Sequence, residues 1–176
     1  CLLSRGLGDV YKRQEGECTR EVSCLSGEVS ELRLWETASI IGTPGSWNGE
    51  GNTCDKAMDG DIGTFFDSDV PTGAWVGLDL GRNTRAMVSR IGYAPRNSTY
   101  AKRLKDGCFQ LSEDADFTNP VTLYTIDVTD TESGTITYRD VDARKPYRYV
   151  RYLSAGENSS GNIAEAEFWG CLLYTS

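Results

Sequence analysis

Residues 59–66 read DGDIGTFF, and residues 163–169 read IAEAEFW. The first stretch is a short acidic turn in which Gly60 and Gly63 let the backbone curl, so that carbonyl oxygens can face inward. The second is a strand with carboxylate side chains near the end of the chain. Carboxylates, a threonine hydroxyl and turn carbonyls are the oxygen ligands that a hard cation such as Ca²⁺ takes. If the fold brings the two stretches together, one cation can join them.

The acidic turn also has a simpler interpretation. Asp59 and Asp61 are of a residue type that bonds its own backbone in ordinary turn-rich loops. The spacing does not match an EF-hand, because the third acidic position and the glutamate at position twelve are lacking. From local spacing alone, an ordinary loop is favoured over a metal site.

The two ends of the chain read as the translation of one inverted DNA element. Residues 9–14 (DVYKRQ) and 171–176 (CLLYTS) are what the two strands of a transposase-type sequencing adapter encode. Coincidence is a poor explanation for two six-residue matches, so we expect residues 1–14 and 171–176 to be adapter-derived and exclude them from fold reasoning. Leaving them out removes three positive charges and one negative charge, which changes the net charge from −8 to −10.

The remaining stretch of about 155 residues is long enough for one domain with a full core. A strongly acidic domain without a basic run repels phosphate backbones and anionic lipid, so we expect no nucleic-acid partner. No apolar run approaches the roughly 20 residues of a membrane span, so we expect no membrane insertion.

Cysteine spacing gives no metal pattern and no dense disulfide scaffold. Outside the expected adapter residues, the chain carries Cys18, Cys24, Cys54 and Cys108. Four cysteines can form two bridges or stay free. We favour free or mixed thiols, and a bridge between Cys54 and Cys108 stays open. Because the chain has no histidine, a zinc site would need four thiolates.

The sequence contains an internal repeat. GEVSELRLWE at 27–36 resembles GNIAEAEFWG at 161–170, with matching glycine, glutamate and tryptophan positions. Similarity at a fixed separation is typical of tandem domains. We therefore expect residues 15–36 to be the tail strand of a preceding copy and residues 37–170 to be the complete module. The alternative is that two amphipathic strands look alike by chance.

The rest of the chain predicts an all-β domain. Short alternating or apolar runs, rich in β-branched and aromatic residues, are separated by Gly, Asn, Asp, Ser and Pro clusters, which favours a sandwich or barrel. The runs lie at 74–80, 86–94, 107–112, 121–128, 134–141, 147–153 and 162–169. No window of helical length shows the three-four repeat, although 52–59 can form one short helical turn. Val150 and Tyr152 are expected on one face of their strand.

Four motifs in chain order resemble the discoidin or factor V/VIII type C superfamily and its bacterial branch, carbohydrate-binding module family thirty-two: KAMDGDIGTFFDS, AWVGLDLG, YRYVRYL and GNIAEAEFWG. The resemblance covers residues 37–170 and implies an eight-stranded jelly-roll β-sandwich of the galactose-binding-like type with a structural Ca²⁺. The ligands it implies are the carbonyls of Lys56, Asp61 and Ala164, the carboxylates of Asp59 and Glu165, and the hydroxyl and carbonyl of Thr64. Glu167, on the same strand face, is the rival for the role of Glu165.

The resemblance places a sugar site on loops at one end of the sandwich. Aromatic rings stack on the apolar faces of sugars, and planar polar groups fix their hydroxyls. The loops at 42–53, 94–103 and 154–162 supply candidates, namely Trp47, Arg96, Asn97, Tyr100, Arg103, Glu157 and Asn158. Each also has a simpler role, such as a cover over the sandwich end, a surface ion pair or a turn cap. The galactose-binding pattern of the family includes a loop histidine, which this chain lacks, so the resemblance implies a sugar without specifying galactose.

The absence of histidine excludes Ser-His-Asp and Cys-His nucleophile systems. A glycosidase pair of carboxylates is not excluded by counting, but the best-placed carboxylates are already assigned to Ca²⁺. The sequence therefore predicts a non-catalytic carbohydrate-binding module, which targets a secreted or cell-surface bacterial glycan-processing protein to a polysaccharide or host glycan. The alternatives are a discoidin domain for protein or cell-surface adhesion and a structural spacer of a glycoside hydrolase.

Overall fold

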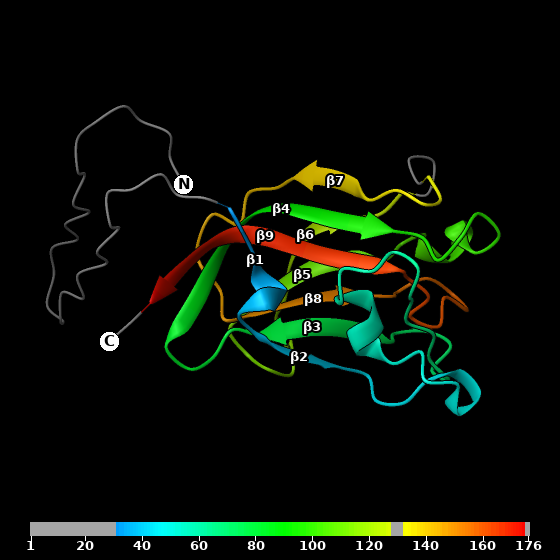
Figure 1. Cartoon of the computed structure of the whole chain (residues 1–176). Helices are drawn as coiled ribbons and strands as arrows, with labels where there is room; N and C mark the ends of the chain where they lie inside the picture. The colour runs from blue at the N-terminus through cyan, green and yellow to red at the C-terminus, as the bar shows by residue number, and fades with distance from the viewer. Residues whose placement is uncertain (1–30, 128–131, 175–176) are drawn as a thin grey trace, which may run out of the picture.

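The computed structural model describes residues 31–127 and 132–174, and this part of the chain contains nine strands (Figure 1). They are β1 (Leu32–Arg33), β2 (Ser39–Gly42), β3 (Trp75–Asp79), β4 (Thr84–Ala94), β5 (Cys108–Ser112), β6 (Val121–Thr125), β7 (Thr137–Asp140), β8 (Tyr149–Leu153) and β9 (Glu165–Tyr174). Each of the runs expected from the sequence overlaps one of these strands. The count exceeds the expected eight by one because it includes the two-residue β1.

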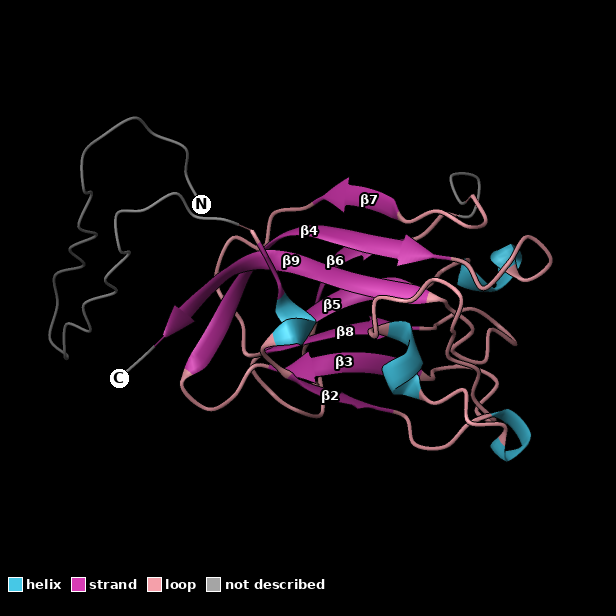
Figure 2. Cartoon of the chain, viewed as in Figure 1, coloured by secondary structure: helices cyan, strands magenta, loops and turns pink. Residues whose placement is uncertain are grey.

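The strands form two antiparallel sheets that pack face to face, with four short 3₁₀ turns and no longer helix in the described residues (Figure 2). One sheet has the order β1-β9-β4-β7, and the other has the order β2-β3-β8-β5-β6. Neighbouring strands are mostly distant in sequence, so the chain crosses between the sheets several times. The expected all-β sandwich is confirmed.

Inward-facing side chains of both sheets fill the space between them. Val150 and Tyr152 of β8 are both fully buried, which confirms that they share the core face of their strand. The ring of Phe109 in β5 lies 5.5 Å from that of Tyr152 and 5.3 Å from that of Phe168 in β9. The contact between Phe109 and Phe168 joins the two sheets across the core.

Residues at both ends of the described chain extend the four-stranded sheet. Leu32 and Arg33 pair with Gly170 and Trp169 of β9. Leu34, in the 3₁₀ turn η1 (Leu34–Glu36), is fully buried in the core. These residues therefore pack against the module, whose expected first residue was 37. Their origin in a preceding copy stays a prediction, and residues 1–30, with the expected adapter at 9–14, lie outside the described residues.

At the other end, β9 continues beyond residue 170. The ladder with β4 runs on until Tyr174 pairs with Thr84. The expected adapter residues 171–174 therefore take part in the sheet, although Tyr174 is 74% exposed. This pairing does not bear on the origin of these residues.

The three described cysteines are free. Cys54, Cys108 and Cys171 form no disulfide, and burial raises the pKa of the Cys54 and Cys108 thiols. Cys18 and Cys24 lie outside the described residues.

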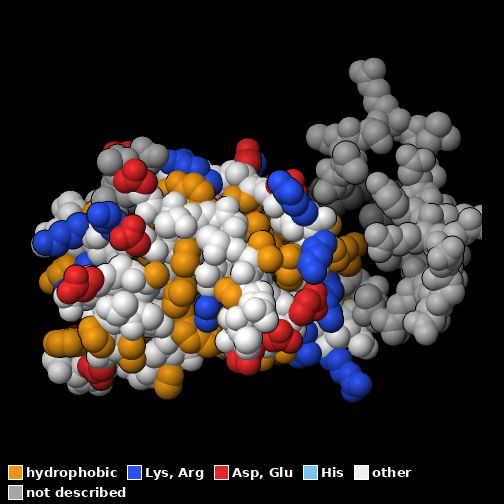
Figure 3. All heavy atoms as spheres, turned by 180° about the vertical axis from the view of Figure 1, so that it is seen from behind, with side chains coloured by type: hydrophobic (Ala, Val, Ile, Leu, Met, Phe, Trp, Pro, Cys, Tyr) orange, Lys and Arg blue, Asp and Glu red, His pale blue; other side chains and the backbone are white. Residues whose placement is uncertain are grey.

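The loops gather at one end of the sandwich, opposite the ends of the described chain (Figure 1). This loop end carries the 3₁₀ turns η2 (Trp47–Gly49) and η4 (Ala101–Leu104), and η3 (Cys54–Ala57) forms the helical turn expected within 52–59. On the face seen in Figure 3, positive and negative side chains lie among one another. Within the described ranges, no helix has the length and apolar character needed to cross a membrane.

Candidate functional site

The acidic turn after η3 curls around the hydroxyl of Thr64. This oxygen lies 2.9 Å from both carboxylate oxygens of Asp59, 3.1 Å from the Lys56 carbonyl and 3.0 Å from the Asp61 carbonyl. Gly60 makes the bend possible, because its φ of +79° is one that side-chain-bearing residues rarely adopt. Four of the sequence-predicted metal ligands therefore meet at one point.

Glu165, the first residue of β9, brings a second carboxylate to this turn. It is fully buried, and its two side-chain oxygens accept no hydrogen bond from the described residues. Burial, the Asp59 carboxylate and Glu167 together raise the pKa of Glu165 to about 8. The buried carboxylate of Glu165, beside the solvent-accessible carboxylate of Asp59, needs a compensating cation or a proton.

Ala164 and Glu167 are the remaining expected ligand and the rival of Glu165, and the structure describes both. Ala164 is buried directly before Glu165, and its N–H donates to the carbonyl of Ala94 at 2.9 Å. Glu167, the rival ligand, accepts a 2.7 Å hydrogen bond from the indole Nε1 of Trp169. Glu165 is thus the strand carboxylate whose oxygens remain available. No three acidic, cysteine or histidine side chains cluster within the described ranges, so any cation here would rely on backbone and hydroxyl oxygens as well as the two carboxylates.

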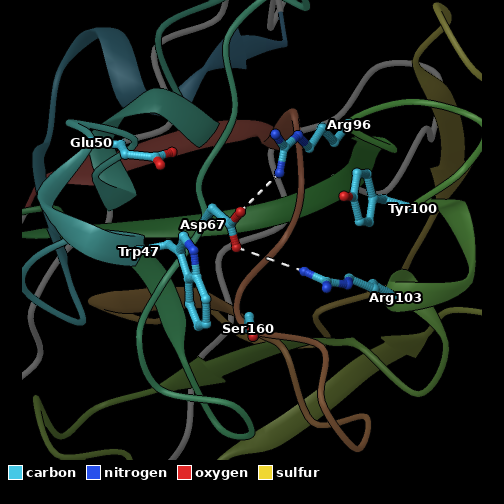
Figure 4. A pocket seen from close by; sticks show the side chains of 7 residues that line it. All are labelled: Trp47, Glu50, Asp67, Arg96, Tyr100, Arg103 and Ser160. Carbon is cyan, nitrogen blue, oxygen red and sulfur yellow. Dashed lines mark hydrogen bonds and ion pairs between the residues drawn. The ribbon is translucent and has the colours of Figure 1, made fainter.

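A pocket of about 300 Å³ opens at the loop end of the sandwich (Figure 4). Three loops and the segment after the acidic turn form its wall. The lining residues are Trp47, Glu50, Asp67, Arg96, Tyr100, Arg103 and Ser160. Trp47, Arg96, Tyr100 and Arg103 were all predicted from the sequence, and the structure brings them together.

Asp67 lies between the two arginines of the pocket (Figure 4). Its Oδ2 accepts a 2.8 Å hydrogen bond from Nη1 of Arg96, and its Oδ1 lies 3.8 Å from Nη1 of Arg103. The Arg96 guanidinium also lies 3.6 Å from the ring centre of Phe65 and 4.8 Å from that of Tyr100. The Arg103 guanidinium lies 4.7 Å from the ring centre of the same Tyr100. Ion pairs and cation–π contacts thus hold both guanidinium groups in place.

Backbone hydrogen bonds of the segment around Asp67 hold the pocket loops together. The Trp47 N–H donates to the Asp67 carbonyl at 2.7 Å, and the Asp67 N–H donates to the Asn52 carbonyl at 3.0 Å. On the other side, the Ser68 N–H donates to the Ser160 carbonyl at 2.7 Å. These bonds leave the Trp47 side chain 46% exposed at the rim, although buried tryptophan is the usual case.

Three predicted residues do not line the pocket. The side-chain oxygen of Asn97 accepts the N–H of Tyr100 at 3.1 Å and so closes the turn that carries Tyr100. Glu157 is exposed. Asn158 has a φ of +54°, and its N–H donates to the Thr72 hydroxyl. The backbone N–H of Asn158 therefore links its loop to Thr72, and the turn-capping role of its side chain stays a prediction.

Sequence reasoning missed three lining residues. Glu50 and Ser160 lie within the loops 42–53 and 154–162, which are expected from the sequence to contact sugar, but neither residue is among the predicted candidates. Asp67 belongs to the FFDS end of the motif that contains the acidic turn. A carboxylate just beyond the acidic turn was the available signal, because the turn itself lies at the loop end of the fold.

The family comparison agrees with the four motifs. A model of the F5/8 type C domain family matches residues 37–168. The CBM62 module of Xyl5A from Clostridium thermocellum is 47% identical, and the match covers 77% of this chain and 96% of that one with a TM-score of 0.73. A search of the curated proteins gave no significant match.

Two more distant structures share the fold. The fucolectin from serum of the striped bass Morone saxatilis is 18% identical, with a TM-score of 0.67 over 81% of this chain and 48% of that one. CpGH89CBM32-5 from Clostridium perfringens, solved with GalNAc-β-1,3-galactose, is 17% identical, with a TM-score of 0.58 over 79% of this chain and 99% of that one.

Proposed function

Because the chain belongs to the F5/8 type C domain family, we propose that it is a non-catalytic carbohydrate-binding module. Its ligand site is the pocket between Trp47, Asp67 and the loop from Arg96 to Arg103. The observation that carries this proposal is the half-exposed Trp47 ring at the rim of a pocket that also holds two fixed guanidinium groups. A ring supplies apolar area for the sugar face, and guanidinium N–H groups donate to its hydroxyl and ring oxygens.

The comparisons support this assignment. The 47% identical relative is a CBM62 module, and the Clostridium perfringens module was solved with a disaccharide. Asp67 is engaged by Arg96 and Arg103, and Glu165 is fully buried at the acidic turn, so neither carboxyl group is free to reach a glycosidic oxygen. The module therefore binds a glycan and leaves the chemistry to other domains.

The acidic turn and the first residues of β9 hold a structural Ca²⁺. Asp59 and Glu165 supply carboxylates, Thr64 supplies its hydroxyl and carbonyl, and Lys56, Asp61 and Ala164 supply carbonyls. The unbonded, buried oxygens of Glu165 support this fit, because a cation satisfies them without a proton. When bound, the ion supplies positive charge that joins the turn to the strand.

The module anchors a secreted or cell-surface bacterial glycan-processing protein to polysaccharide or host glycan, beside a second copy of itself. The repeat between 27–36 and 161–170 supports the tandem arrangement. A single shallow pocket binds weakly, and two linked modules gain through effective concentration.

A glycan array followed by calorimetry tests the proposal. The chain should bind at least one glycan class, and Trp47→Ala should weaken that binding about tenfold or more, because the stacking ring is lost. Its melting temperature should stay close to that of the parent, since the Trp47 ring is half exposed. Tyr138→Ala is the matched control, because Tyr138 is 42% exposed on β7, outside the pocket lining.

Two outcomes would contradict the proposal. One is the absence of any glycan signal at high protein concentration. The other is unchanged affinity in Trp47→Ala, which would place the ligand elsewhere.

A further inference from the structure

Asp67 carries a buried charge at the centre of the pocket. Its side chain is 11% exposed, and the guanidinium groups of Arg96 and Arg103 approach it from the same loop (Figure 4). Arg96 uses Nη1 to bond Oδ2 of Asp67 at 2.8 Å. Nη1 of Arg103 lies 3.8 Å from Oδ1, beyond hydrogen-bond distance, so Asp67 attracts this group without using up its N–H donors.

The charges that line the pocket are balanced. Arg96 and Arg103 carry two positive charges, and Asp67 and Glu50 carry two negative charges. A guanidinium that is already paired with a mostly buried carboxylate attracts a second anion less strongly. Each guanidinium has five N–H donors, and Arg96 gives one of them to Asp67, so neutralisation leaves most of their hydrogen-bonding capacity for uncharged oxygens.

We propose that Asp67 fixes the chemical class of the ligand: by neutralising Arg96 and Arg103, it makes the pocket select an uncharged sugar over a uronic acid. This inference rests on the proposed glycan-binding function of the same pocket. A sugar carboxylate entering beside Asp67 meets a like charge, which is unfavourable in a partly buried site. Sugar hydroxyls and ring oxygens instead accept from the guanidinium groups that Asp67 orients.

Asp67 acts through the arginines and is therefore a positioning residue. Its backbone also bonds Trp47 and Asn52, but a substitution of the side chain leaves those bonds possible. Asp67→Asn keeps the shape and removes the charge. A purely structural role would weaken binding of all glycans alike, whereas a role in charge selection changes the preference between neutral and anionic glycans.

The test is calorimetric titration of the chain with neutral oligosaccharides and with uronic-acid oligosaccharides, each at low and at moderate salt. The parent chain should bind a neutral glycan with little dependence on salt and bind uronates at least about tenfold more weakly. In Asp67→Asn, affinity for the neutral glycan should fall about tenfold, because Arg96 loses a charge-assisted bond, and salt-sensitive uronate binding should rise about tenfold.

Asp69→Asn is the matched control. It removes the same charge two residues away, where Asp69 accepts the N–H of Asn48 and does not line the pocket. It should retain the preference of the parent chain for neutral glycans. Melting curves of both variants establish that they fold.

The inference is overturned if the parent chain prefers uronates, or if folded Asp67→Asn keeps the affinities and preference of the parent. If Asp67→Asn does not fold, a parent chain that binds uronates as well as or better than neutral glycans still overturns the inference. A chain that binds neither class overturns the proposed function instead, so the two failures are distinguishable.

Discussion

At the scale of single residues, the pocket depends on side chains that hold each other. Arg96 lies between the Asp67 carboxylate and the rings of Phe65 and Tyr100, so its planar group is fixed on several sides. A lysine cannot reproduce this arrangement, because it lacks the planar fork. Such preorganisation lowers the entropic cost of binding a ligand.

The sequence predicted those site residues whose type and surrounding loop composition indicate a side chain at the surface. Trp47 and Arg96 lie in glycine- and polar-rich loops, where side chains are expected at the surface and not in the core. Asn97 is equally polar, but its side chain closes its own turn, and the N–H of Asn158 binds Thr72 of a distant loop. Composition does not separate these roles from ligand binding. Asp67 was missed because its partner is 29 positions away, a distance that only the folded chain closes.

Gly161 provides a test at this scale. Its φ is +72°, and an added Cβ would lie 2.5 Å from Cε1 of the buried Phe66. Gly161→Ala should therefore lower the free energy of unfolding by about 2–4 kcal/mol, through backbone strain and overpacking together. Urea denaturation measures the change.

Gly134→Ala separates the two causes. Gly134 has a φ of +82° but no atom within 4 Å of the added Cβ, so strain acts there alone. It should cost about 1 kcal/mol. Equal losses in both variants would contradict the role of the contact with Phe66.

At the scale of elements, alternation of side chains was sufficient to find most strands. The run YRYVRYL places Val150 and Tyr152 on the core face, as the period of two requires. β2 was not foreseen, because SIIG is short and ends in glycine. Gly42 is needed there, since a Cβ would lie 2.6 Å from the carbonyl of Trp75 on the neighbouring strand. Such requirements come from strand pairing and leave no periodic signal.

The Asp79–Arg148 pair links the end of β3 to the start of β8 and predicts a pH-dependent stability. Arg148 donates from Nε and Nη2 to the two carboxylate oxygens of Asp79, at 2.8 and 2.9 Å. The bond from Arg148 lowers the pKa of Asp79 below its ordinary value. The pair therefore stabilises the fold at a pH above the unfolded-state pKa of about 4, and this contribution disappears as the pH falls through the lower folded-state value.

Asp79→Asn should reduce stability by about 1 kcal/mol at pH 7, and the difference from the parent should shrink progressively as the pH is lowered below about 4. Denaturant titrations across this pH range measure it. The amide oxygen can still accept the Gly81 N–H that Asp79 binds, so the turn is retained. A difference that is constant with pH would contradict the assignment to this ion pair.

At the scale of the whole molecule, long-range contacts bring the acidic turn, the pocket loops and β9 to one end of the sandwich. The Phe66 N–H donates to the Ile163 carbonyl at 2.9 Å, which fixes the segment between the acidic turn and Asp67 against the chain that enters β9. Local patterns predicted strands but not the sheet order, because pairing of distant strands leaves no local signature. The family resemblance supplied the sandwich and the meeting of Asp59 with Glu165.

Calcium removal is the prediction at this scale. A ligand that binds only the native state stabilises it by about 3 kcal/mol at a hundredfold excess over its dissociation constant. For a domain of this size, this corresponds to a loss of roughly 6–12 °C in melting temperature when a chelator is added. Scanning calorimetry with and without the chelator measures the shift.

Glu165→Gln should be insensitive to the chelator, because it removes one of the two carboxylates at the turn. Asp116→Asn, on an exposed loop away from that turn, should respond as the parent does. Overlapping melting curves for the parent chain with and without the chelator would rule out a stabilising calcium ion.

The central claim is that the pocket at the loop end binds a glycan. A crystal structure of the chain soaked with a panel of monosaccharides tests it most directly. The account predicts one sugar ring against the indole of Trp47, with its oxygens within hydrogen-bond distance of Arg96 and Arg103. A sugar bound on another surface, with this pocket open and vacant, would contradict it.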